Sequence, residues 1–230
     1  MKEHKSGMVE LAEQRRSVYA WLALVYLHEP TGDFARMLKN QQILSFLNEV
    51  GIDVDQRMHG DDEEGWLEEL EMEYTRLFIG PGEHVSPYES VWHDDGGMLW
   101  GKTTAEIKKF IESLGLKYRT EWSGLPDHVG VELELMHRLI TREHEAWMQR
   151  DRQNALLCLE IENKFVDEHL SRWIPRFCER VIHESFLDFY KQVAQLTEEF
   201  IEFDRKQIND LLEAVLQPPF FLVPANKIFG

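Results

Sequence analysis

The segment Gly96–Thr103, with the sequence GGMLWGKT, matches the P-loop pattern, in which backbone N–H groups hold phosphates and a lysine reaches them. A working P-loop joins a buried strand of a parallel sheet to a helix. The preceding residues Pro87–Asp95 are polar and rich in turn formers, so no such strand is expected. A P-loop-like nucleotide-binding protein or NTPase is therefore kept only as an alternative.

Two further patterns could bind a metal or move a proton. Glu134 and His137 have the Glu-x-x-His spacing of di-iron bundles, but that site needs a second copy and two more glutamates. Asp127 and His128 could form an acid–base pair, yet neighbours on a helix point about 100° apart. We interpret Asp127 as the N-cap of a helix that follows Pro126.

The two cysteines, Cys158 and Cys178, lie in different predicted helices and lack metal-type spacing. No catalytic group of residues remains, so we expect a protein that is not an enzyme and needs no cofactor or metal. A disulfide framework is also not expected, which is typical of the reducing cytoplasm.

A recognition segment runs from Glu73 to Trp92 and beyond. Its large apolar residues are Tyr74, Phe78, Pro81, Pro87, Tyr88, Trp92 and Trp100, and its acids are Glu73, Glu83, Glu89, Asp94 and Asp95. Aromatic anchors surrounded by carboxylates suit a peptide that carries an apolar stretch and arginines. The same aromatics could equally pack an irregular loop against the core.

Helical periodicity dominates the chain, and no alternating strand pattern is found. The predicted fold is all-α, a single compact domain of about eight or nine helices over residues 1–216, followed by an extended tail, 217–230. Gly80 to Lys102 is predicted to be irregular but packed, and Gly115 to end a helix. The helices are expected at about 8–28, 33–50, 66–79, 103–114, 125–149, 154–173, 175–182, 185–203 and 206–216.

Charge limits the partners. The chain has 42 acidic and 25 basic residues and a formal net charge of −17, which repels nucleic acid and attracts a basic peptide. Arg15-Arg16 before the apolar run Val18–Leu27 loosely resembles an export signal, but no cleavage site follows. The run is also shorter than the roughly 20 residues that span a bilayer. We predict a buried first helix and no stable membrane insertion.

Several blocks resemble the TorD/DmsD family of molybdoenzyme maturation chaperones, which is related to the NarJ group. The resemblance covers about residues 15–200 in the family's order. The blocks are Tyr74–Pro81 (YTRLFIGP), Pro87–Trp92 (PYESVW), Leu125–Val129 (LPDHV) and Phe165–Phe177 (FVDEHLSRWIPRF). Tyr88-Glu89 departs from the Trp-Gly of many signal-peptide binders, which leaves the client preference open. Gly101, Thr103 and Thr104 match a family Gly-x-Ser/Thr-Thr segment, which makes Lys102 incidental.

The resemblance implies an all-helical, cytoplasmic chaperone, either monomeric or a domain-swapped homodimer. Its implied partner is the precursor of a molybdopterin-dependent oxidoreductase catalytic subunit, bound through its twin-arginine signal peptide before cofactor insertion and export. A generic helical adaptor is the other alternative. By motif position, the peptide-binding residues are Tyr74, Leu77, Phe78, Pro87, Tyr88, Ser90, Trp92, Gly101, Asp127 and His128.

Overall fold

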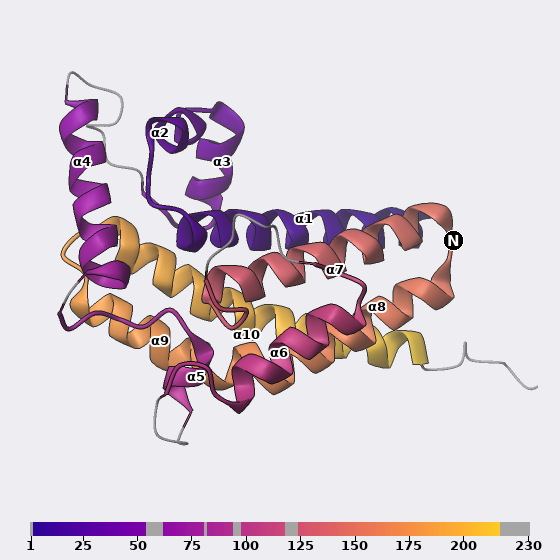
Figure 1. The fold of residues 1–230 in the computed structure, drawn as a ribbon. Helices are drawn as coiled ribbons and strands as arrows, with labels where there is room; N and C mark the ends of the chain where they lie inside the picture. The colour runs from indigo at the N-terminus through magenta and orange to yellow at the C-terminus, as the bar shows by residue number, and fades with distance from the viewer. Residues whose placement is uncertain (1, 54–61, 81, 94–97, 118–123, 217–230) are drawn as a thin grey trace, which may run out of the picture.

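Long helices lie side by side and form the body of the molecule in a computed structural model (Figure 1). The structure describes residues 2–53, 62–80, 82–93, 98–117 and 124–216. The body consists of α1 (Lys2–Leu27), α7 (Val129–Gln149), α8 (Arg152–Phe165), α9 (Ser171–Glu184) and α10 (Asp188–Leu216). The shorter helices are α2 (Gly32–Leu38), α3 (Gln41–Glu49), α4 (Glu63–Tyr74), α5 (Glu89–Trp92) and α6 (Lys102–Ser113).

Two π-helical turns extend these helices without a break. The turn η2 (Thr75–Ile79) continues α4, and η3 (Val166–Leu170) joins α8 to α9. When each turn is counted with the helices it continues, the described residues form nine helices and no β-strand. The prediction of an all-α domain is confirmed, whereas the tail 217–230 lies outside the described residues.

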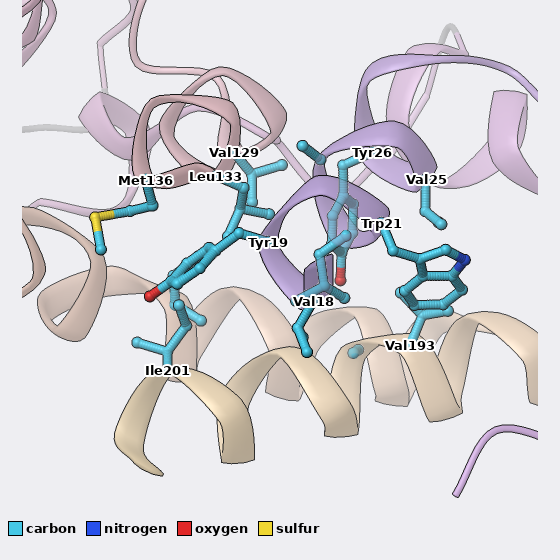
Figure 2. Packing of buried hydrophobic residues seen from close by; sticks show 14 of the residues in the cluster. Val18, Tyr19, Trp21, Val25, Tyr26, Val129, Leu133, Met136, Val193 and Ile201 are labelled. Atoms are coloured by element: carbon cyan, nitrogen blue, oxygen red, sulfur yellow. The ribbon is translucent and has the colours of Figure 1, made fainter. Parts of the chain in front are cut away.

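The core lies where α1 packs between α7 and α10. Figure 2 shows Val129, Leu133 and Met136 of α7 on one side of α1, with Ile201 of α10 on the other. Val129, Leu133, Met136 and Ile140 of α7 are all buried, because their spacing in the sequence places them on one helical face. This packing fixes the position of the N-terminal end of α7, next to which the functional motifs lie.

The breaks between helices differ from the prediction at three places described next. The helix expected over 33–50 is split between α2 and α3, because the Asn40 side chain accepts the Gln42 N–H and starts a new helix. Pro175 does not end a helix: it lies just behind η3, whose wider register already interrupts the α-helical ladder. The break expected before Lys206 is absent because the buried Asp204 faces the core within a continuous α10.

A buried ionic cluster explains why Asp204 is in the core. Arg15 of α1 donates to Asp204, to Glu143 Oε2 of α7 at 2.8 Å and to Glu162 Oε2 of α8 at 2.7 Å. The Tyr19 hydroxyl also donates to Asp204 at 2.8 Å. Burial raises the pKa of Glu162 well above its ordinary value, against the opposing effect of Arg15. We call Arg15, Glu143, Glu162 and Asp204 the Arg15 cluster; it connects four helices. The first helix, α1, is buried as predicted.

None of the helices in the described parts of the chain combines the length and the apolar character that crossing a bilayer requires.

Candidate functional site

The strap, which we define as residues 85–93, carries the PYESVW motif across the N-terminal end of α7. Its path is fixed by backbone hydrogen bonds: the Val85 N–H donates to Leu77 O at 2.7 Å, and the Glu89 N–H donates to Asp127 O at 2.8 Å. The Val129 N–H returns a bond to Pro87 O at 2.8 Å, which makes Tyr88 and His128 an isolated antiparallel bridge. Two motifs some forty residues apart therefore lie side by side.

Asp127 and His128 have different roles from those predicted. The N-cap of α7 is His128, whose Nδ1 accepts the Gly130 N–H at 3.1 Å; the assignment of Asp127 as N-cap is wrong. Asp127 is fully buried and accepts the Ser90 N–H at 3.1 Å through Oδ2. It lies in a turn before α7 that the His128 N–H closes by donating to Leu125 O at 3.3 Å. Burial lowers the pKa of His128 to about 4, so the ring is neutral at pH 7.

A buried group of carboxylates and histidines lies beneath the strap. Glu89 is fully buried; its carboxylate bonds to His93 Nε2 at 2.9 Å and to His169 Nδ1 at 3.0 Å. Glu132 of α7 is also fully buried and accepts the Trp173 Nε1–H at 3.0 Å. We call Glu89, His93, Glu132 and His169 the Glu89 cluster. Burial, followed by the charge of Glu89, raises the pKa of Glu132 well above its usual range.

The C-terminal end of the strap is anchored by Trp92. Its indole Nε1–H donates to Ser86 O at 2.8 Å, and its ring meets Phe177 edge-on at a centroid distance of 6.0 Å. Arg176 donates to the carbonyl of Trp92. Trp92 and Tyr88 are both half-buried, so each offers part of its ring to solvent, whereas Pro87 and Ser90 are buried.

The first motif block supplies core residues. Tyr74, Leu77 and Phe78 are all buried, and the Tyr74 hydroxyl donates to Tyr26 O at 2.8 Å. The Phe78 ring packs against Tyr26 at 5.9 Å and Tyr74 at 5.2 Å. In the structure as it stands, these three predicted site residues support the strap from below and have little surface for a peptide.

An acidic groove of about 560 Å³ lies beside this block. Four glutamates from three parts of the chain line it: Glu29, Glu68, Glu71 and Glu83. Its other lining residues are Met72, Thr75, Arg76, Gly80 and Gly82. Met72 is 59% exposed, and Ile79, within the adjoining η2, is 61% exposed. The groove therefore combines carboxylates with accessible apolar surface.

The acids predicted to surround the recognition segment have separate positions. Glu83 is exposed in the groove, but Glu73 is buried and accepts from Arg76 at 2.8 Å and from the Phe186 N–H at 2.5 Å. Burial raises the pKa of Glu73, but the Arg76 and Phe186 hydrogen bonds lower it below the ordinary value overall. Glu89 belongs to the Glu89 cluster, and Asp94 and Asp95 lie outside the described residues. Glu73 and Glu89 are thus engaged inside the protein.

The P-loop match has no phosphate-binding geometry in the part of it that the structure describes. Gly101 is the N-cap of α6, with a half-buried backbone, and Lys102 is 80% exposed and pairs with Glu106 at 3.3 Å. The described residues before it, 82–93, include the strap with its short helix α5 and contain no β-strand. Gly96 and Gly97 lie outside the described residues.

The other candidate chemical groups are also engaged elsewhere. Glu134 pairs with Arg138 at 2.8 Å, and His137 Nδ1 bonds to Arg16 O at 3.0 Å. Within the described ranges, no three His, Cys, Asp or Glu side chains are grouped in a way that could hold a metal ion.

The residues predicted from the sequence did not include Glu132, His169 or the groove glutamates Glu29, Glu68 and Glu71. Glu132 had a usable signal, because it falls three residues after Val129 on the apolar face of α7, where an acid must be buried. His169 belongs to the motif block Phe165–Phe177, but the spacing of residues in the sequence does not predict its contact with Glu89. Glu29 and Glu68 meet in the groove only through the tertiary fold.

Comparisons with known proteins match more than half of the chain. The sequence model described as "Nitrate reductase delta subunit" matches residues 47–179. The chain is 25% identical over 203 residues to "Chaperone protein TorD" of Vibrio parahaemolyticus, covering 84% of this chain and 93% of that protein. It is 25% identical over 218 residues to the Vibrio cholerae protein of the same name, covering 88% and 96%. These relatives are named chaperones, not enzymes.

Among solved structures, a crystal structure described as a putative redox enzyme maturation protein from Archaeoglobus fulgidus is similar in fold. The TM-score is 0.51 at 21% identity, and the match covers 82% of this chain and 93% of the other. At this identity the likeness concerns the fold alone.

Proposed function

The chain belongs to the nitrate reductase delta subunit family, and we propose that it is a cytoplasmic maturation chaperone for a molybdopterin-dependent oxidoreductase. Its client is the precursor of the catalytic subunit, bound through the twin-arginine signal peptide. The names of the curated relatives support a chaperone role. A bound signal is withheld from export while the molybdenum cofactor enters the still open client.

The observation that carries this proposal is the acidic groove next to the strap. Its four glutamates can receive two consecutive arginines through charge-assisted hydrogen bonds, which are stronger than neutral ones. The exposed side chains of Met72 and Ile79 offer apolar surface to the stretch that follows the arginines in such a signal. The net charge of −17 adds a long-range attraction for a basic peptide, which accelerates encounter.

The predicted contact residues divide into two groups under this proposal. Tyr88, Trp92 and Gly101 have accessible surface and can touch a peptide directly. The remaining seven are buried and hold the shape of the site, or become accessible only after a movement of the strap: Tyr74, Leu77, Phe78, Pro87, Ser90, Asp127 and His128.

Isothermal titration calorimetry with the signal peptide of the client precursor tests the proposal. The double variant Glu68→Gln/Glu71→Gln removes two groove charges while keeping side-chain size. We expect binding about tenfold weaker, because two exposed ion pairs contribute up to about 1 kcal/mol each. The dependence of affinity on salt should also become shallower.

The matched control is Glu145→Gln/Glu199→Gln, which removes two exposed charges from α7 and α10 outside the groove. The control should bind like the wild type. Equal weakening by both double variants would assign the effect to net charge and contradict the groove. Absence of binding by the wild type would contradict the proposed function itself.

A further inference from the structure

The closed strap leaves several buried polar atoms without a hydrogen-bond partner. They lie on the strap and on the elements that it touches: Ser90 Oγ, Thr104 Oγ1 of α6, and Asp127 Oδ1 just before α7. All three side chains are at least nine-tenths buried. An unsatisfied buried polar group normally costs free energy, so several together favour a second arrangement in which these atoms meet water or a ligand.

The contacts that hold the strap closed are mainly polar. Its backbone is fixed to residues 127–129 by the bridge, and Glu89 is bound by His93 and His169. Val85, at the start of the strap, is buried in the core. Residues 88–93 contain no fully buried apolar side chain, and their main apolar anchor is the half-buried Trp92 against Phe177. A segment with few buried apolar contacts can open locally without unfolding the bundle.

We propose that the strap is a latch, which the Glu89 cluster holds closed and which opens to admit an extended segment of the client. Opening frees Asp127 O and the Val129 N–H, the two backbone groups that now bond to the strap. An extended peptide can replace the strap at these groups by pairing as a strand. It also brings hydrogen-bond donors to Asp127 Oδ1, while Ser90 Oγ meets water on the opened strap; in this respect the latch rests on the proposed function.

The charges around Glu89 explain why the cluster can hold the latch. Glu89 faces His93 at the end of α5, His169 of η3 and the carboxylate of Glu132, and the charge of Asp127 also acts on Glu132. Two carboxylates as close as Glu89 and Glu132 share a hydrogen bond only if one of them is protonated. The raised pKa of Glu132 keeps its proton available, while the histidines satisfy Glu89. Removing a histidine therefore leaves a buried carboxylate short of a donor.

Native-state hydrogen exchange on the free protein tests the latch without any client. The reporters are the amides of Glu89 and Ser90, compared with core amides of α7 such as Leu133 and Leu139. In the wild type we expect the strap amides to exchange through a local opening, faster than the core amides. In His169→Phe the opening should be ten- to a hundredfold more frequent, because a hydrogen bond to a charged group is lost.

Two variants separate this effect from a general loss of stability. His169→Asn keeps a donor at the position of Nδ1 and should retain most of the protection. His137→Phe makes the same replacement on α7 at a histidine bonded to Arg16 O, and should leave the strap amides unchanged relative to the core. Strap amides that exchange only together with the core, or respond alike to both Phe variants, would overturn the latch.

The client arm uses the same signal peptide in calorimetry. If the closed state excludes the peptide, only the small open fraction of the protein can bind it, and the apparent affinity is lower by that fraction. His169→Phe opens more often and should therefore bind the peptide at least tenfold more tightly. Unchanged affinity despite more frequent opening would overturn the latch as a gate. Failure of every variant to bind, with the exchange contrast intact, would instead contradict the proposed function and leave the latch supported.

Discussion

His128 shows how one residue can cap a helix and respond to pH. Its Nδ1 accepts the Gly130 N–H, which requires the neutral ring, and its ring meets Tyr88 edge-on at 5.2 Å. Burial lowers its pKa to about 4, so protonation both charges a buried ring and removes the cap acceptor. Unfolding relieves both effects.

We predict that His128 destabilises the fold at low pH. Its folded pKa is below the unfolded value of about 6.5, so its contribution is fully present above pH 6.5 and is lost as pH falls toward 4. The loss should approach about 3 kcal/mol. His128→Asn keeps a side chain that can cap α7 but does not titrate. Urea unfolding at pH 7 and pH 4.5 should show the wild type losing stability relative to the variant.

The direction of this pH dependence identifies His128, because the buried carboxylates change the stability of the fold with pH in the opposite direction. Glu132 and Glu162 have raised pKa values, so the stability they contribute falls as pH rises. They are common to both proteins and cancel in the comparison. A wild type and variant that change in parallel between the two pH values would refute the role of His128.

Side-chain chemistry at the site was only partly predictable from sequence. The motif blocks led to the strap and to Asp127-His128, but Glu73 and Glu89 were expected at the surface. A glutamate in a polar window gives no sign of burial when its partner is distant along the chain. Glu89 is paired with His169, 80 residues away, and no local pattern reports that contact.

Element positions depend on one close approach between α1 and α7. Gly130 lies in the first turn of α7, where a Cβ atom would be only 2.5 Å from Leu27 Cγ and 3.1 Å from the Leu27 backbone nitrogen. The backbone contact cannot be relieved by a side-chain rotation. Glycine therefore lets the start of α7, with the adjoining Asp127-His128 motif, reach the end of α1.

We predict that Gly130→Ala destabilises the protein by about 1–3 kcal/mol, because overpacking forces α1 and α7 apart. The control is Gly7→Ala in α1, where a Cβ meets nothing within 4 Å and helix propensity favours alanine. The control should be neutral or slightly stabilising. Thermal unfolding of both variants measures the contrast; a Gly130→Ala protein as stable as the wild type would contradict the assigned contact.

The helices themselves were largely predictable, whereas their junctions were not. Apolar periodicity identified each long helix, and Gly115, with its φ of +70°, ends the α6 segment as expected. Asn40, Pro175 and Asp204 were misjudged because their effect depends on what they contact. A polar residue can start, interrupt or simply line a helix, and tertiary partners decide which.

At the scale of the whole molecule, the Arg15 cluster is the main polar contact inside the bundle. One guanidinium satisfies carboxylates from α7, α8 and α10, so it fixes how these helices lie against α1. Burial raises the pKa of Glu143 and of Glu162, and the charge of Arg15 opposes this effect. Removing the arginine would leave three buried acids without their common cation.

We predict that Arg15→Met destabilises the protein by about 3–5 kcal/mol, as expected when one partner of a buried ion pair is removed. Arg16→Met is the matched control, because the half-buried Arg16 side chain pairs with Glu13 on its own helix. The control should change stability by less than about 1 kcal/mol. Chemical denaturation of both proteins gives the comparison, and equal losses would contradict the central role of Arg15.

The π-helical turn η3 has a consequence for sequence change in this protein. A π turn is an α-helix that has gained one residue, and the extra residue rotates everything after it by roughly 100°. With the π turn in place, His169 forms a hydrogen bond with Glu89 and Trp173 forms one with Glu132. A regular α-helix over the same residues would turn Trp173 and Phe177 away from their partners, whereas loss of one residue together with the π turn would keep them in place. The π turn itself is therefore needed for these contacts, as much as the residue types are.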